Sequence, residues 1–96
     1  MSYRVVVGPL VRRNITSWQL SDPIWVTVYL RLEDLGQSPS KLRRETAPFD
    51  GMTYRFSLID PTNRLVEHFF VFAVFYSQDE ESLIVARGAY VRSAGL

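Results

Sequence analysis

The amino-acid sequence predicts an α+β fold made of a short N-terminal strand, two helices and then a three-stranded antiparallel meander. Apolar residues recur at helical spacing in the first half, and in the second half they alternate or form blocks of strand length. Proline, glycine and asparagine mark the junctions between these segments. With 96 residues, of which 47% are apolar and 14% aromatic, residues 1–96 are expected to form one domain around one dense core.

Composition excludes several classes of protein. The chain has no cysteine, which excludes a disulfide framework, a thiolate metal site and a cysteine nucleophile. Its first residues, Met1 to Gly8, reach charge and glycine too early for the apolar core of a signal peptide, and no apolar run approaches ~18 residues. We therefore expect a cytoplasmic protein that does not enter a membrane.

The first strand is predicted at Tyr3 to Val7, a β-branched run that stops at Gly8 and Pro9. A helix is expected beyond the proline, because three apolar residues recur at i, i+4 and i+7 and so share one helical face. These residues are Val11, Ile15 and Trp18.

A second helix is predicted after Ser21 and Asp22, whose side chains can cap free N–H groups, with Pro23 at the first helical position. Gly36 stands where a residue that ends a helix belongs. The apolar residues of its predicted inner face are Trp25, Val28, Leu32 and Leu35. Because the start of this segment is rich in strand-forming residues, Ile24 to Leu35 stays open between helix and strand, although caps and length favour the helix.

The segment from Gln37 to Gly51 is expected to cross the surface as an irregular, mobile connection, because it holds two prolines and many polar residues. The meander follows. It is predicted from the alternation of Tyr54, Phe56 and Leu58, the apolar run Leu65 to Tyr76, and a last strand Leu83 to Ala86 that ends with Arg87 and Gly88. Polar turns at 60–63 and 77–81 join these strands. Phe70, Phe72 and Val85 are expected in the core.

No local motif has the spacing of a phosphate loop, a metal-binding histidine pair or a serine-centred catalytic elbow, so no metal or cofactor is expected. What remains is a set of polar residues on or just beyond the strands, several of which a meander could bring to one surface. These are Arg55, His68, Arg87, Tyr90 and Arg92. Each also has a structural interpretation: His68 as a strand-entry residue with a local hydrogen bond, and Tyr90 as a ring that closes the core edge.

The order of these elements resembles the RelE/ParE toxin superfamily. The matching pieces are a strand, two helices, a basic connection, and a meander that ends in an arginine and an aromatic residue. In this chain they are Tyr3-Arg4-Val5-Val6-Val7, Tyr54-Arg55-Phe56 and Leu83-Ile84-Val85-Ala86-Arg87-Gly88-Ala89-Tyr90. The resemblance covers nearly the whole chain.

The resemblance implies the toxin of a toxin–antitoxin pair, neutralised by a cognate antitoxin. RelE-like members cut messenger RNA on the ribosome without a metal, and ParE-like members inhibit DNA gyrase without cutting. In the RNase branch, Arg55 and Arg87 would hold phosphate and Tyr90 would serve proton transfer or base stacking, with His68 as a candidate base. Arg43, Arg44 and Arg92 would contact RNA.

Two alternatives to an RNase stay open. The first is a protein-interaction domain, either a ParE-like gyrase inhibitor or an inactive homologue. It would be favoured if the four catalytic candidates, Arg55, His68, Arg87 and Tyr90, failed to converge. The second is a structural protein that forms a homodimer through its surplus of phenylalanines. A separate expectation is that the chain binds an acidic, partly helical partner, because the first helix and the connection are basic. Their basic residues are Arg12, Arg13, Lys41, Arg43 and Arg44.

Overall fold

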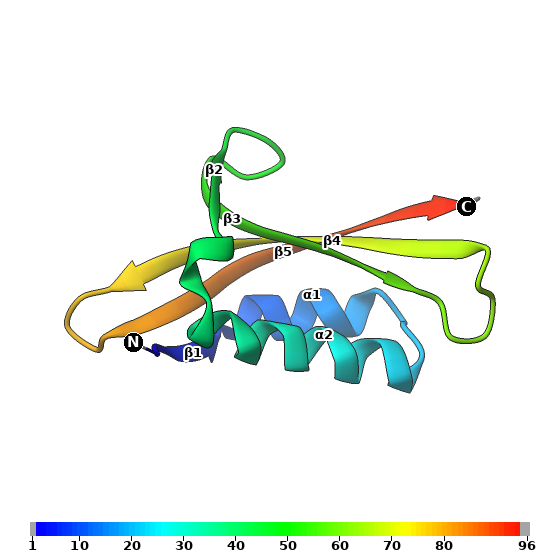
Figure 1. The fold of residues 1–96 in the computed structure, drawn as a ribbon, viewed down its shortest axis with the longest axis horizontal. Helices are drawn as coiled ribbons and strands as arrows, with labels where there is room; N and C mark the ends of the chain where they lie inside the picture. Colours follow the sequence, from blue (N-terminus) through cyan, green and yellow to red (C-terminus); the bar gives the residue numbers. More distant parts are fainter. Residues whose placement is uncertain (1, 95–96) are drawn as a thin grey trace.

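The computed structural model describes residues 2–94, with side chains described up to residue 91 (Figure 1). None of the helices among these residues is long and apolar enough to cross a membrane. In chain order the elements are β1 (Arg4–Val7), α1 (Pro9–Ser17), α2 (Asp22–Asp34), the short 3-10 helices η1 (Leu35–Gln37) and η2 (Pro39–Lys41), β2 (Arg43–Glu45), β3 (Gly51–Ile59), β4 (Val66–Ser77) and β5 (Ser82–Ala94).

The strands form one five-stranded mixed sheet in the order β1-β5-β4-β3-β2. The predicted meander is present, since β3, β4 and β5 are antiparallel neighbours. The sheet extends beyond the meander at both edges, by the predicted N-terminal strand β1 and by β2, which was not predicted. At one edge β1 pairs in parallel with β5, with Val5 opposite Leu83, and at the other edge β2 pairs with the start of β3.

Both helices lie on one face of the sheet (Figure 1). The segment left open between helix and strand is a helix in α2, and its buried face carries Ile24, Val28 and Leu32 at i, i+4 and i+8. The prediction that Trp25 lies on this face is wrong: its side chain is 39% exposed and its Nε1–H donates to Asp22. Ile24 occupies the inner position, so the next residue is turned about 100° away.

The core lies between the helices and the sheet. Phe70, Phe72 and Val85 are almost fully buried there, as predicted. The indole of Trp18, at the end of α1, packs on the rings of Phe70 and Tyr90 with centroids 5.8 and 5.9 Å away. Aromatic contacts therefore join the first helix to the two central strands.

The connection at 37–51 is more regular than predicted. It holds two 3-10 turns and then β2, which pairs with β3 from Arg43 opposite Thr53 to Glu45 opposite Gly51. Glu45 accepts hydrogen bonds from the Thr53 hydroxyl and from Arg55, and these contacts hold the hairpin closed. The hairpin stands away from the sheet on the side opposite the helices (Figure 1).

The last strand does not end at Gly88 as predicted, because β5 continues to Ala94. Gly88 lies opposite Phe72, and a Cβ atom there would come within 2.8 Å of the Phe72 ring. This glycine therefore makes room for a core side chain instead of ending the strand. One residue earlier in the ladder the register shifts between Ala73 and Val74, which leaves Ala86 as an extra residue in β5.

Candidate functional site

The sheet separates the four catalytic candidates into two pairs. Phe56, Phe70 and Tyr90 are neighbours across β3, β4 and β5 and face the helices, as does His68 two residues before Phe70. Arg55 and Arg87 alternate with this set and lie on the other side of the sheet, which we call the open face. His68 and Tyr90 are brought together, whereas Arg55 and Arg87 lie on the other face, so the four candidates do not converge on one surface.

On the helix side, His68 is only 5% exposed and both of its ring nitrogens have partners. Nδ1 lies 2.5 Å from the Tyr90 hydroxyl, and Nε2 lies 2.8 Å from Oδ2 of Asp60. The other carboxylate oxygen of Asp60 accepts from the Thr62 amide at 2.8 Å and from its hydroxyl at 2.7 Å. A chain of hydrogen bonds thus runs from the β3–β4 turn to β5.

The charge of Asp60 fixes the direction of its hydrogen bond with His68. The hydrogen bond from His68, followed by those from Thr62 and Asn63, holds the pKa of Asp60 well below its ordinary range. An ionised carboxylate can only accept, so Nε2–H of His68 donates to it. Nδ1 of a neutral His68 is then the acceptor for the Tyr90 hydroxyl. The turn pattern at 60–63 does not predict this contact of Asp60. The signal that could have done so is the position of Asp60 directly after a strand that pairs with the strand of His68.

These hydrogen-bonded side chains border a cavity of about 270 Å³ between the β3–β4 turn and the end of α1. His68 is the only imidazole in its lining, and no lysine or arginine contributes to that lining among the described side chains. The lining residues are Trp18, Gln19, Leu20, Ser21, Ile24, Asp60, Thr62, His68 and Tyr90. The backbone of Arg92 lies opposite His68, but its side chain lies outside the described ones.

The Asp60–His68 contact predicts a pH-dependent stability. The pKa of Asp60 is lower in the folded protein than in the unfolded chain, where it is ~4. The ionised carboxylate therefore stabilises the fold above that pH, and this stabilisation is lost as the pH falls toward the pKa of the folded state. Urea melts at pH 7 should therefore show Asp60→Asn to be less stable than the wild type, and the difference should shrink between about pH 4 and pH 2. Asp79→Asn, in the turn after β4, controls for the lost charge. A difference independent of pH would contradict the assignment.

On the open face, Arg55 is already paired within the hairpin. Its Nε donates to both carboxylate oxygens of Glu45 at 2.6 and 2.7 Å, and its Nη2 donates to the Ala47 carbonyl at 3.0 Å. Hydrogen bonds from Thr53 and then from Arg55 lower the pKa of Glu45. The side chain of Arg55 is still half exposed, so its guanidinium remains accessible from solvent.

The other predicted arginines are dispersed. Arg87 lies on the open face with its guanidinium over the ring of Phe49, 5.5 Å from the centroid. Arg43 and Arg44 are both exposed but are consecutive residues of β2, so their side chains leave opposite faces of the strand. Arg43 also donates to the Ser40 carbonyl at 2.5 Å. Arg43, Arg55 and Arg87 are thus each held by a different partner, and Arg55 and Arg87 both lie on the open face.

The open face also carries a hollow of about 480 Å³ with apolar walls. Its lining includes Arg55, Ser57, Phe69, Val71 and Val91. Phe69 is 37% exposed and Val91 is 54% exposed, and they lie opposite each other on β4 and β5. This hollow combines exposed apolar side chains with one accessible guanidinium.

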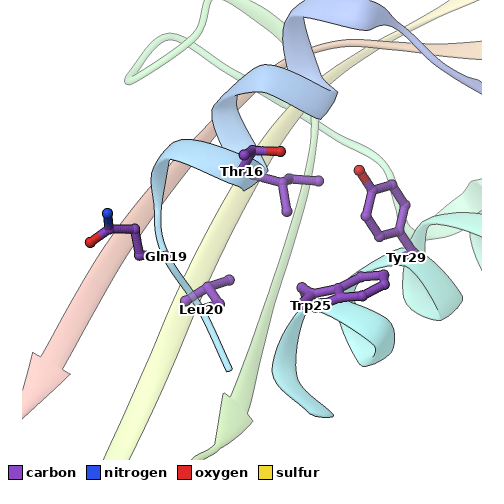
Figure 2. A pocket seen from close by; sticks show the side chains of 6 residues that line it. Thr16, Gln19, Leu20, Trp25 and Tyr29 are labelled. Atoms are coloured by element: carbon purple, nitrogen blue, oxygen red, sulfur yellow. The ribbon is translucent and has the colours of Figure 1, made fainter. Parts of the chain in front are cut away.

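A further hollow of about 310 Å³ lies between the two helices (Figure 2). Its walls include Thr16 and Gln19 from the α1 end and Trp25 and Tyr29 from α2, whose rings meet edge to face at 5.8 Å. It contains none of the predicted site residues. Among the described residues, no three histidine, aspartate or glutamate side chains are grouped so that they could hold a metal ion.

Comparison with known proteins gives no relative. No protein-family model, no curated protein and no solved structure matches this chain. The function therefore has to be argued from the two sites described above.

Proposed function

We propose that this chain is a toxin-like module of the RelE/ParE kind that acts by binding a protein partner through its open face, without cutting RNA. The order of its elements supports the first half of this proposal: a strand, two helices on one side, and a meander whose last strand pairs with the first. The distribution of its polar residues supports the second half.

The observation that carries the proposal is the separation of the catalytic candidates. RNA cleavage needs a proton acceptor and positive charge within hydrogen-bond reach of one phosphate. Here the acceptor candidate His68 is buried among partners on the helix side, whereas Arg55 and Arg87 lie on the open face, held by Glu45 and Phe49. The sheet lies between the two groups, so they cannot act on the same phosphate.

The open face favours a partner segment that presents an apolar side chain next to a carboxylate. Phe69, Val71 and Val91 offer an apolar surface, and Arg55 lies beside them with an exposed guanidinium. A partner carboxylate could replace or share the Glu45 contact of Arg55. Basic residues of the nearby hairpin would speed the approach of an acidic partner. A cognate antitoxin with such a segment would cover the same hollow and neutralise the module.

One observation favours RNA cleavage as a second candidate. The contact between His68 and Tyr90 joins a base to a hydroxyl, and Asp60 orients the imidazole as an acidic residue orients the base in hydrolytic triads. In that case the cavity on the helix side would be the active site. Variants of His68 therefore separate the two candidates.

Inducible expression in bacteria tests the proposal. We expect wild-type protein to arrest growth and Val91→Glu to abolish the arrest, because the new carboxylate would repel an acidic partner from the hollow. Leu30→Glu is the matched control, since Leu30 is equally exposed, at 54%, but lies on α2. His68→Gln should still arrest growth.

Three outcomes would contradict the proposal. Soluble, folded wild-type protein that leaves growth unchanged would rule out a toxin. Equal loss of arrest in Val91→Glu and Leu30→Glu would rule out the open face as the specific surface. Loss of arrest in a folded His68→Gln protein would favour the catalytic candidate instead.

A further inference from the structure

The outer edge of β3 is incompletely paired. β3 has nine residues, but β2 has three and pairs only with Gly51 to Thr53. Since the sheet order ends in β3-β2, no described strand lies beside Tyr54 to Ile59 on that side. Tyr54 is only 2% exposed, so the accessible part of this edge is Arg55 to Ile59. Backbone N–H and C=O groups that point outward there can pair with another strand. Five residues is within the typical length of a strand.

The opposite edge of the sheet, at β1, is covered by another segment of the chain. There the amide of Tyr3, just before β1, donates to the Gly36 carbonyl at 2.9 Å, and the chain of η1 passes so close that Gly36 has no room for a Cβ atom. At the β3 edge the usual devices that prevent pairing are missing. The stretch has no proline or lysine and no bulge against β4, and its one charged residue is Arg55.

We propose that two copies of this chain pair through this edge, antiparallel about a two-fold axis, so that their sheets become continuous. When two identical strands pair antiparallel about a two-fold axis, each residue lies opposite a residue of the same sequence read in the other direction. The charges along the strand therefore decide which registers avoid like-charge pairs. A register centred on Phe56 would place Ile59 of the second copy opposite Thr53, where Arg43 of β2 already lies, so it is excluded. A register centred on Ser57 places Arg55 opposite Ile59 of the second copy. This register sets no two like charges against each other.

The side facing the helices fits the same arrangement. Its residues near the centre of the edge are Phe56 and Leu58, which are half-buried in the monomer. In the register centred on Ser57, Phe56 meets Leu58 of the second copy, so apolar groups oppose apolar groups. Cross-strand pairs of this kind stabilise antiparallel sheets. The inference does not rest on the proposed function, because pairing through the backbone edge needs no toxin activity, although Arg55 and Ser57 also line the hollow of the open face.

Ser57→Lys tests the proposal. The new lysine would lie opposite the same residue of the second copy across the two-fold axis, so two like charges come together. Within one chain Ser57 donates to Glu67, so a lysine there has an anionic neighbour and the monomer should still fold. Ser77→Lys is the matched control, on the same face of β4 but away from the edge.

Light scattering across a concentration series gives the mass of each purified protein. We expect the wild type and Ser77→Lys to form dimers, and Ser57→Lys to have a dissociation constant raised up to about fivefold, from the one like-charge pair that the two lysines form at the centre of each dimer. A wild type that stays monomeric at every concentration would overturn the proposal. So would a dimer that Ser57→Lys leaves unchanged, because it would have to form through another surface.

Hydrogen exchange of the wild type gives a measurement that needs no variant. Amides of residues 55–59 that point away from β4 should exchange more slowly as protein concentration rises, while those of the exposed turn at 78–81 should not change. Exchange at 55–59 that is independent of concentration, in a sample that dimerises, would also overturn the proposal.

Discussion

Phe72→Ala should cost ~3–5 kcal/mol of unfolding free energy, the largest effect expected for a single core side chain in this protein. Phe72 is 0% exposed and lies at the centre of β4, with the Phe56 ring stacked at 5.8 Å and the Trp18 ring at 6.1 Å. Its truncation would leave a cavity that these rigid rings cannot close. Gly88, opposite Phe72 on β5, has no side chain with which to fill the gap.

Phe75→Ala provides the comparison for Phe72→Ala in denaturant melts. Phe75 is on the same strand but 52% exposed on the open face, so its truncation should cost less than about 1 kcal/mol. Similar losses in the two variants would show that the core does not lie between β4 and the helices. A loss under about 1 kcal/mol for Phe72→Ala would contradict the packing described here.

Gly36→Ala should destabilise the fold by about 3 kcal/mol, the upper end of what overpacking usually costs. A Cβ atom at this position would lie 2.2 Å from the carbonyl oxygen of Tyr3 and 3.0 Å from the side chain of Val5. Because the first of these neighbours is backbone, rotation of a side chain cannot relieve the clash. The connection after α2 would have to separate from β1, which would break the Tyr3–Gly36 hydrogen bond.

Gly8→Ala is the matched comparison for Gly36→Ala, because its Cβ would lie 3.2 Å from the Val85 carbonyl oxygen, a gap that a small shift can relieve. Thermal and urea melts should place Gly36→Ala well below Gly8→Ala in stability. If the two variants melt alike, the close approach of η1 to β1 is wrong.

The parts of the fold that the sequence predicted correctly are those with strong local signals. The helix α2 follows from Pro23 at its start and from the spacing of Val28 and Leu32. The strand β2 could not be predicted in the same way. It has three residues with no apolar pattern, and it pairs because Glu45 reaches Thr53 and Arg55 on the next strand, contacts that exist only once the hairpin has formed.

The candidate site shows the same limit. Alternation around Phe56 and Phe70 was sufficient to separate Arg55 from His68, as the structure does. The position of Arg87 was not predictable, because counting by two from the buried Val85 places it on the helix side. The extra residue Ala86 shifts the alternation of side chains along β5 by one residue, so Arg87 lies on the open face. A bulge of one residue cannot be recognised from the sequence when the strand around it is a continuous run of apolar residues.

The most direct test of the proposed function is the integrity of ribosome-bound messages in cells arrested by the wild-type protein. Mapping of 5′ ends compares wild type, His68→Gln and uninduced cells. Because the base candidate and the two open-face arginines lie on opposite sides of the sheet, we expect the wild type to produce the same 5′ ends as uninduced cells. New 5′ ends that appear with the wild type and disappear with a folded His68→Gln protein would contradict the account.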